Sequence, residues 1–149
     1  MKLVEILVSN QTDIINEAFN SLQRSHLKHY DSSQADENWQ RLAKLFDLIL
    51  DGIKTKNLVD MVNYSEKVAK ERFESGFDLH EVHTAYNVLE ESLWKCIIKE
   101  VDSTELAESL GLVGTVLGTG KESLALAYVS LASKQKVKSL NLTQLFKGV

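Results

Sequence analysis

The stretch AKERFESGFDLHEVHTAYNVLEESL, residues 69–93, decides the fold class, because it contains the end of one helix and the start of the next. Gly76 is placed to end the first helix, since glycine adopts the left-handed backbone conformation without steric strain. Asp78 and Glu81 have the three-residue offset of a capping box, which predicts that a second helix starts there. The stretch therefore predicts two helices joined by a short glycine turn.

Outside this stretch, apolar residues keep the three-and-four spacing that is typical of amphipathic helices. The pattern predicts helices over about residues 2–28, 36–53, 56–75 and 78–99. Thr55 is expected to be the N-cap of the third helix, and the polar segment 29–35 is expected to be a loop. Asn10 and Gln11 interrupt the apolar stripe of the first helix, so a break at that point is also open.

The last segment begins with a second acidic cap, Asp102 with Glu105, and then carries an apolar seam with nearly sevenfold spacing. The seam consists of Leu106, Leu110, Val113, Leu117, Leu124, Tyr128 and Leu131. Glycine also occurs here at positions 111, 114, 118 and 120. Because each glycine costs about 1 kcal/mol relative to alanine inside a helix, we expect a break or kink near Thr119 and Gly120.

The composition supports an all-α fold. The chain has 149 residues, of which 44% are hydrophobic and 26% are charged, and it contains no proline. A complete absence of proline favours long uninterrupted helices over a turn-rich sandwich or barrel. We therefore predict one helical domain over residues 1–149, an up-down bundle of four to five helices with a long C-terminal helix. A globin-like arrangement of these helices is compatible with the same pattern.

Charge and hydropathy exclude several classes of partner. The net charge of −4 provides no field that would attract a polyanion, so we expect no nucleic-acid partner. No stretch approaches the roughly 20 apolar residues that span a bilayer, so we expect a cytoplasmic protein without a membrane partner. The single cysteine, Cys96, excludes an internal disulfide and fits a reducing compartment.

Motifs for nucleotide binding and nucleophilic catalysis are absent from the sequence. Gly120 and Lys121 end a glycine-rich run, but Glu122 stands where a phosphate loop requires serine or threonine. The run also follows a predicted helix rather than a strand. Cys96 has no sequence cue for a partner histidine, and no serine lies in a Gly-x-Ser-x-Gly elbow. We therefore expect no catalytic residues and no enzyme.

The four histidines form two pairs, His26 with His29 and His80 with His83. Each pair has three-residue spacing, which places both imidazoles on one helix face. In an up-down bundle the end of the first helix meets the start of the fourth, so the two pairs could form a zinc-type site. The alternative is that the histidines are partly exposed polar or proton-responsive residues.

Residues 69–93 resemble the N-terminal helical domain of stressosome RsbR-type co-antagonists and, more distantly, the corresponding stretch of bacterial sensor globins. The shared features are a helix bearing an arginine, here Arg72, then a glycine-centred turn at Gly76 and an amphipathic helix with an early aromatic residue, here Tyr86. The remainder of the chain agrees with these proteins in helix order and length. The resemblance implies a signal-input domain that commonly acts as a dimer.

Sensor globins bind haem through a histidine shortly before this glycine turn. Residues 72–75 of the present chain are Arg, Phe, Glu and Ser, so no residue matches that ligand. The resemblance therefore implies the branch without haem, and we expect no cofactor. Such domains are usually followed by an output domain, and this sequence ends at Val149, so we expect either that the output partner is a separate protein or that the chain resembles the family in structure only.

These observations lead to a functional hypothesis of a non-enzymatic sensory or regulatory module that acts on other signalling proteins in bacterial signal transduction. We expect a homodimer formed through the seam, with Gly114, Gly118 and Ala125 permitting close approach. The alternative for the seam is packing inside one chain, because both arrangements share the same period. A metal- or small-ligand-binding bundle that uses the four histidines is the alternative function, and an unrecognised catalytic protein is a third.

Overall fold

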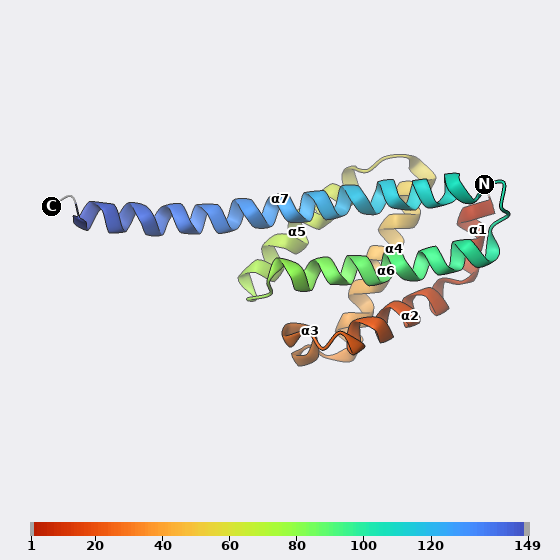
Figure 1. The fold of residues 1–149 in the computed structure, drawn as a ribbon, viewed down its shortest axis with the longest axis horizontal. Coiled ribbons are helices and arrows are strands. Elements are labelled where there is room, and N and C mark those ends of the chain that lie inside the picture. Colours follow the sequence, from red (N-terminus) through yellow and green to blue (C-terminus); the bar gives the residue numbers. More distant parts are fainter. Residues whose placement is uncertain (1, 148–149) are drawn as a thin grey trace.

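The computed structural model describes the backbone of residues 2–147 and the side chains of residues 2–134. It contains α1 (Lys2–Ser9), α2 (Gln11–Arg24), α3 (Lys28–Ser32), α4 (Ala35–Thr55), α5 (Val59–Glu74), α6 (Leu79–Glu100) and α7 (Leu106–Lys147). No strand occurs within the described backbone (Figure 1). The predicted all-α bundle with a long C-terminal helix is therefore confirmed.

The bundle is organised around α6, which lies between α2 and α7 (Figure 1). In the same view α6 and α7 run antiparallel, and α4 crosses behind α6. The other long contact is between α5 and α7. Leu89, Leu93 and Ile97 of α6 are fully buried, and each of the seven helices contributes side chains to the same core. Within the described residues, no helix is both long enough and apolar enough to cross a bilayer.

The turn between α5 and α6 has the local structure that the sequence predicts. Gly76 has φ of 89°, in the left-handed region that favours glycine. Asp78 accepts a hydrogen bond from the Glu81 backbone N–H at 3.0 Å, and Glu81 Oε1 accepts one from the Asp78 N–H at 3.1 Å. This reciprocal pair is the predicted capping box, and it fixes the first residue of α6.

The N-terminal quarter of the chain differs from the sequence-based prediction in two places, the first being that α2 ends at Arg24 rather than near residue 28, and it also decides the alternative left open at Asn10. The predicted helix over residues 2–28 is divided at Asn10, whose side-chain amide donates to the Ile6 carbonyl at 2.8 Å. The Asn10 backbone N–H donates to the same carbonyl at 3.1 Å, and Asn10 itself is a turn residue between α1 and α2. The predicted loop at 29–35 is wrong in its first half, because α3 forms at Lys28–Ser32.

Two predicted helix starts also need correction. Thr55 is the last residue of α4 rather than the N-cap of α5, and its hydroxyl donates to the Asp51 carbonyl. α5 begins four residues later, at Val59. Asp102 accepts a hydrogen bond from the Thr104 backbone N–H at 3.3 Å, so it closes a turn before α7 instead of forming a capping box with Glu105.

The predicted break in the last helix does not occur, because α7 is continuous over 42 residues, Leu106–Lys147. At Gly120 a Cβ atom would lie 2.8 Å from Met61 Sδ, so α5 approaches α7 too closely there for a side chain. At Gly118, by contrast, a Cβ atom would have no neighbouring atom within 4 Å. The helical cost of the glycines is therefore offset by packing against α5 and α6, and only Gly120 is required by that packing.

This difference predicts opposite effects for two neighbouring alanine substitutions. Gly118→Ala is expected to raise the free energy of unfolding by about 0.5–1 kcal/mol, because it adds helix propensity without a clash. Gly120→Ala is expected to give no gain or a loss, since the new methyl group must displace the buried Met61. Urea denaturation of both variants measures the difference, and destabilisation by Gly118→Ala would contradict a continuous α7.

Candidate functional site

One pole of the bundle brings together α3, the α5–α6 turn and the first turn of α6. His29 donates its backbone N–H to Glu81 Oε2 at 2.9 Å, and its Nδ1 lies 2.6 Å from Glu81 Oε1. The Glu81 residue is only 4% exposed. The end of the first predicted helix therefore does meet the start of the fourth, but the residue that His29 contacts is Glu81 rather than another histidine.

The protonation state of Glu81 follows from its surroundings. Burial by itself raises the pKa of this carboxyl, but hydrogen bonds from the His29 backbone, the Asp78 backbone and the His29 side chain outweigh burial and lower it. Glu81 is therefore ionised at neutral pH and acts only as an acceptor. It follows that His29 Nδ1 carries the proton in this contact.

The four histidines are not brought together as predicted. His26 lies after the end of α2 and has φ of 49°, so it does not share a helix face with His29. His80 is exposed on α6, and His83 Nδ1 lies 3.3 Å from the Asn87 side-chain amide. Among the residues with described side chains, no group of three or more His, Cys, Asp or Glu could hold a metal ion. The structure therefore does not assemble the predicted metal site.

The pole also contains a cluster of cationic and aromatic side chains around Phe77. The Arg41 and Arg72 guanidinium carbons lie 5.6 Å and 5.8 Å from the centre of the Phe77 ring. The His29 and Tyr30 rings lie 4.9 Å and 5.1 Å from it. Both distances from the arginines are within the range of cation–π attraction, so Phe77 joins α3, α4 and α5 at this pole.

Sequence reasoning missed Arg41 entirely and assigned no role to the side chain of Arg72. A signal was present, because each arginine falls on the buried stripe of its helix, three or four residues from Asn38 or Val68. A charged residue on an apolar stripe is uncommon, since burying a charge is costly unless it has a partner. The interruption of the stripe could therefore have marked both positions.

The predicted dimer seam packs mainly inside this chain. Val113, Leu117, Leu124 and Tyr128 are buried against α5 and α6, and Leu106, Leu110, Gly114 and Leu131 are partly buried. Lys121 and Glu90 add an ion pair of 2.8 Å between α7 and α6. The four buried residues in the middle of the seam are thus covered by other helices of the same chain.

The opposite side of α7 is apolar and exposed where the helix leaves the bundle. Leu126 and Val129 are 64% and 58% exposed. Leu126 borders an open groove of about 400 Å³ between α5 and α7, with Glu66 and Lys70 on its other side. Val129 borders a second groove of about 510 Å³ beside Phe73 and Phe77. α7 is thus a ridge with a groove along each flank.

The pole and α7 are in direct contact. The Tyr128 hydroxyl donates to the Phe77 carbonyl at 3.3 Å, and the Phe73 and Tyr128 rings meet edge to face at 5.8 Å. Burial raises the pKa of Tyr128, so its hydroxyl is protonated at neutral pH and can donate this bond. A change in the position of the α5–α6 turn would therefore act directly on α7 through Tyr128.

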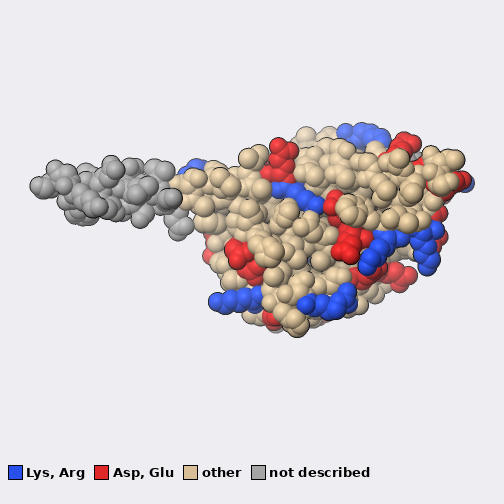
Figure 2. Space-filling view, in the orientation of Figure 1, with Lys and Arg blue, Asp and Glu red and all other residues tan. Residues whose placement is uncertain are grey.

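Charged groups are sparse on the face that carries α6 and α7. Figure 2 shows this face as mainly uncharged, with lysine, arginine, aspartate and glutamate in small separate groups. The Lys121–Glu90 pair joins α7 to α6 at 2.8 Å, and the Lys95–Glu17 pair joins α6 to α2 at 2.9 Å. On this face the charged side chains are scattered and both signs are present (Figure 2).

Comparison with known proteins assigns the family. A family model described as the RsbT co-antagonist protein rsbRD N-terminal domain matches residues 13–133, which include the whole pole and the packed part of α7. No curated protein and no solved structure matched the chain. The family match covers more than half of the chain and agrees with the resemblance carried by residues 69–93. The chain therefore belongs to the family of RsbT co-antagonist RsbRD N-terminal domains.

Proposed function

We propose that this chain is a non-enzymatic regulatory module of bacterial stress signalling, that it works in the cytoplasm, and that it acts through contacts of α7 with other proteins. Membership of the family supports a role in stress signalling, because the family is described as the N-terminal domain of an RsbT co-antagonist protein. The observation that carries the proposal is the length of α7 relative to the bundle against which it packs.

α7 has 42 residues, which corresponds to a helix about 63 Å long. Its C-terminal part extends beyond the end of the bundle, where no other helix accompanies it (Figure 1). A helix without tertiary packing is marginally stable in water, because most helical stability in proteins comes from a buried apolar face. A second chain that packs along α7 would supply that missing burial.

A second copy of this chain is the partner that fits best. The ridge formed by Leu126 and Val129 lies between two grooves, so the same surface contains both a protruding and a receiving element. A twofold dimer requires such a self-complementary surface, because each chain contributes the same patch. Ridges packed into grooves are also the usual geometry of helix–helix contact.

The contacts of Tyr128 supply a route by which the bundle could act on this interface. Tyr128 contacts the α5–α6 turn through the Phe77 carbonyl. The next residue, Val129, lies on the exposed side of α7, which is called here its outer face. A displacement of the turn would shift α7 relative to its partner. This module would therefore convert a change inside the bundle into a change in helix packing at the dimer.

A dimer predicts that the sedimenting mass rises with protein concentration. Charges placed on the exposed outer face of α7, at Leu126 and Val129, are expected to abolish this rise. Wild-type protein is expected to sediment as a dimer at high micromolar concentration, and the double variant Leu126→Glu, Val129→Glu as a monomer with unchanged helical circular dichroism. Buried glutamates at an interface lose hydration without gaining a partner. Val59→Glu, at an exposed apolar position on α5, is the matched control and should remain dimeric.

A wild-type chain that stays monomeric at high micromolar concentration would overturn the homodimer, as would a dimer that survives both glutamates. The partner is tested separately. Tagged protein isolated from its native organism is expected to retain an RsbT-type protein or another co-antagonist, and the double variant to retain less of it. Equal retention by both would show that the outer face of α7 is not the contact surface.

A further inference from the structure

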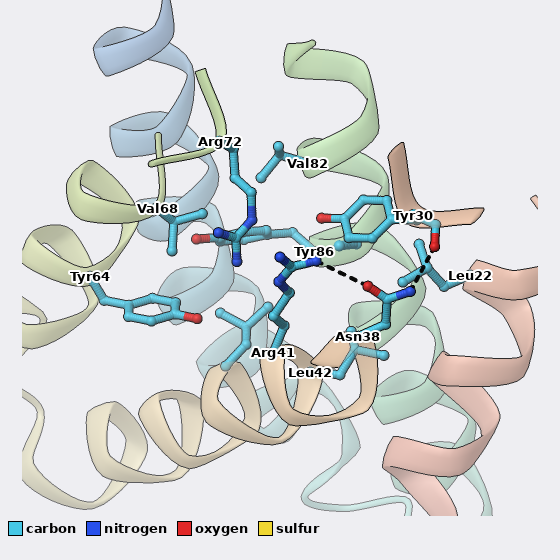
Figure 3. Close-up of a pocket in the computed structure, with 12 residues that line it drawn as sticks. Leu22, Tyr30, Asn38, Arg41, Leu42, Tyr64, Val68, Arg72, Val82 and Tyr86 are labelled. Carbon is cyan, nitrogen blue, oxygen red and sulfur yellow. Dashed lines mark hydrogen bonds between the residues drawn. The ribbon is translucent and has the colours of Figure 1, made fainter. Parts of the chain in front are cut away.

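A small cavity in the interior of the bundle is lined by residues of α2, α3, α4, α5 and α6. Its volume is about 20 Å³, close to the minimum that holds one water molecule. Figure 3 shows Arg41 and Arg72 entering this cavity from α4 and α5, with the guanidinium groups facing each other and Tyr30, Tyr64 and Tyr86 around them. Aliphatic side chains close the remaining walls.

The two arginines place positive charge in a cavity whose lining residues include no carboxylate. Arg41 binds Glu37 at 2.6 Å, and Arg72 lies 3.6 Å from Glu71, but both glutamates are exposed and lie outside the cavity. The Arg72 side chain is only 12% exposed. Burial and then the proximity of Arg72 lower the pKa of Arg41. The like charges are therefore only partly compensated.

The hydrogen-bonding capacity of the two arginines differs. Arg41 donates to Glu37 and to Asn38 Oδ1 at 3.0 Å, so it has protein acceptors. Arg72 Nε is buried and has no hydrogen-bond partner. A buried N–H of a charged group without an acceptor is costly, because its desolvation is not repaid. Because Arg72 lines the cavity, an acceptor placed there would be available to its guanidinium group.

The tyrosine side chains around the cavity have neutral hydroxyl groups, each of which can donate one hydrogen bond. Burial raises the pKa of Tyr30 to about 12 and also raises the pKa values of Tyr64 and Tyr86, so all three remain protonated at neutral pH. The Tyr86 hydroxyl lies 2.9 Å from Ser65 Oγ. A ring of guanidinium and phenol donors around a small volume has the chemistry of an anion site.

We propose that this cavity binds one small monovalent anion, of the size of chloride or formate, between Arg41 and Arg72. The volume of about 20 Å³ excludes a drug-sized molecule or a long carboxylate. A single negative charge bridges the two guanidinium groups, accepts from tyrosine hydroxyls and offers an acceptor to Arg72. The site ties α4 to α5 next to the turn that contacts α7.

The first test compares anions at constant ionic strength on the intact chain. Sodium gluconate, whose anion is too large for the cavity, is replaced stepwise by sodium chloride, formate or acetate, and thermal unfolding is followed. A melting temperature about 3–6 °C higher is expected when the bound anion is present at ten times its Kd. Binding should weaken from formate to acetate as the anion grows, and no difference from gluconate would overturn the site.

The second test removes the cationic groups singly. Arg72→Met is expected to abolish the anion-dependent shift, whereas Arg24→Met, which removes the same charge from the exposed end of α2, should retain it. Equal loss in both variants would indicate a general salt effect and overturn the proposal, as would a full shift in Arg72→Met.

Chloride-35 line broadening on the wild-type protein, displaced by formate and not by gluconate, tests the site without any variant. A line width that formate leaves unchanged would contradict the proposal even if Arg72→Met failed to fold.

Discussion

Glu81→Ala is expected to lower the free energy of unfolding by about 2–4 kcal/mol, because it removes a buried acceptor and leaves its donors without partners. The donors are the His29 backbone N–H, His29 Nδ1 and the Asp78 backbone N–H. The substitution also removes one half of the capping box of α6. Urea denaturation at neutral pH measures this loss of stability. The substitution also removes the hydrogen bonds that join α3 to α6.

Glu81→Gln is the matched control, because its one amide oxygen can still accept from either the Asp78 or the His29 backbone N–H, while the charge and the second acceptor are lost. Its cost is expected to be smaller than that of Glu81→Ala, about 1–2 kcal/mol at neutral pH. The folded protein lowers the pKa of Glu81 below the unfolded value of 4.5, so the ionic contribution is complete above that pH. It is lost as the pH falls through the folded pKa. The gap between wild type and Gln should therefore shrink below pH 4.5, and a gap that widened there would contradict the assignment.

Leu117→Ala is expected to destabilise the chain by about 2–5 kcal/mol, because Leu117 is fully buried where α7 packs in the core. For a domain of this size the loss corresponds to a melting temperature lower by roughly 4–20 °C. Thermal unfolding at low protein concentration measures it. Sedimentation of the folded variant should still show the dimer, because Leu117 does not reach the outer face of α7.

Leu126→Ala makes the comparison decisive, since the same side chain is removed from the same helix at an exposed position. Its effect on the stability of the separate chain should stay within about 0.5 kcal/mol, but self-association should weaken. If Leu117→Ala instead weakened association and left stability unchanged, the seam would lie between chains rather than inside one. The pair thus separates the two roles that one apolar period can have.

The α5–α6 turn could be predicted in detail because every interaction that forms it is local. Gly76, Asp78 and Glu81 lie within six residues, and their roles as helix terminator and cap depend on backbone groups in the same turn. The all-α class followed from the periodicity of apolar residues and the absence of proline, which are also local properties. The contacts of Asn10 at the end of α1 are likewise local, since its side chain bonds to a residue four positions earlier.

The candidate site could be predicted only in part, because its contacts join distant parts of the sequence. The sequence predicted that the end of the first helix meets the start of the fourth, but the partner of His29 is 52 residues away and is the cap residue Glu81. Arg41 and Arg72 meet only after α4 and α5 have packed. The predicted break of α7 was wrong for a similar reason, since helix propensity does not include the packing of α5 against Gly120.

By itself the sequence determined the all-α class, the approximate positions of the long helices, the glycine turn, the capping box of α6 and the family resemblance, since short-range backbone and side-chain preferences encode all of these. The tertiary structure alone decided three further features. It placed the α7 seam inside the chain, left Leu126 and Val129 outside, and brought two guanidinium groups to one cavity. An apolar period specifies that one helix face is buried, but the arrangement of the neighbouring helices specifies what covers it.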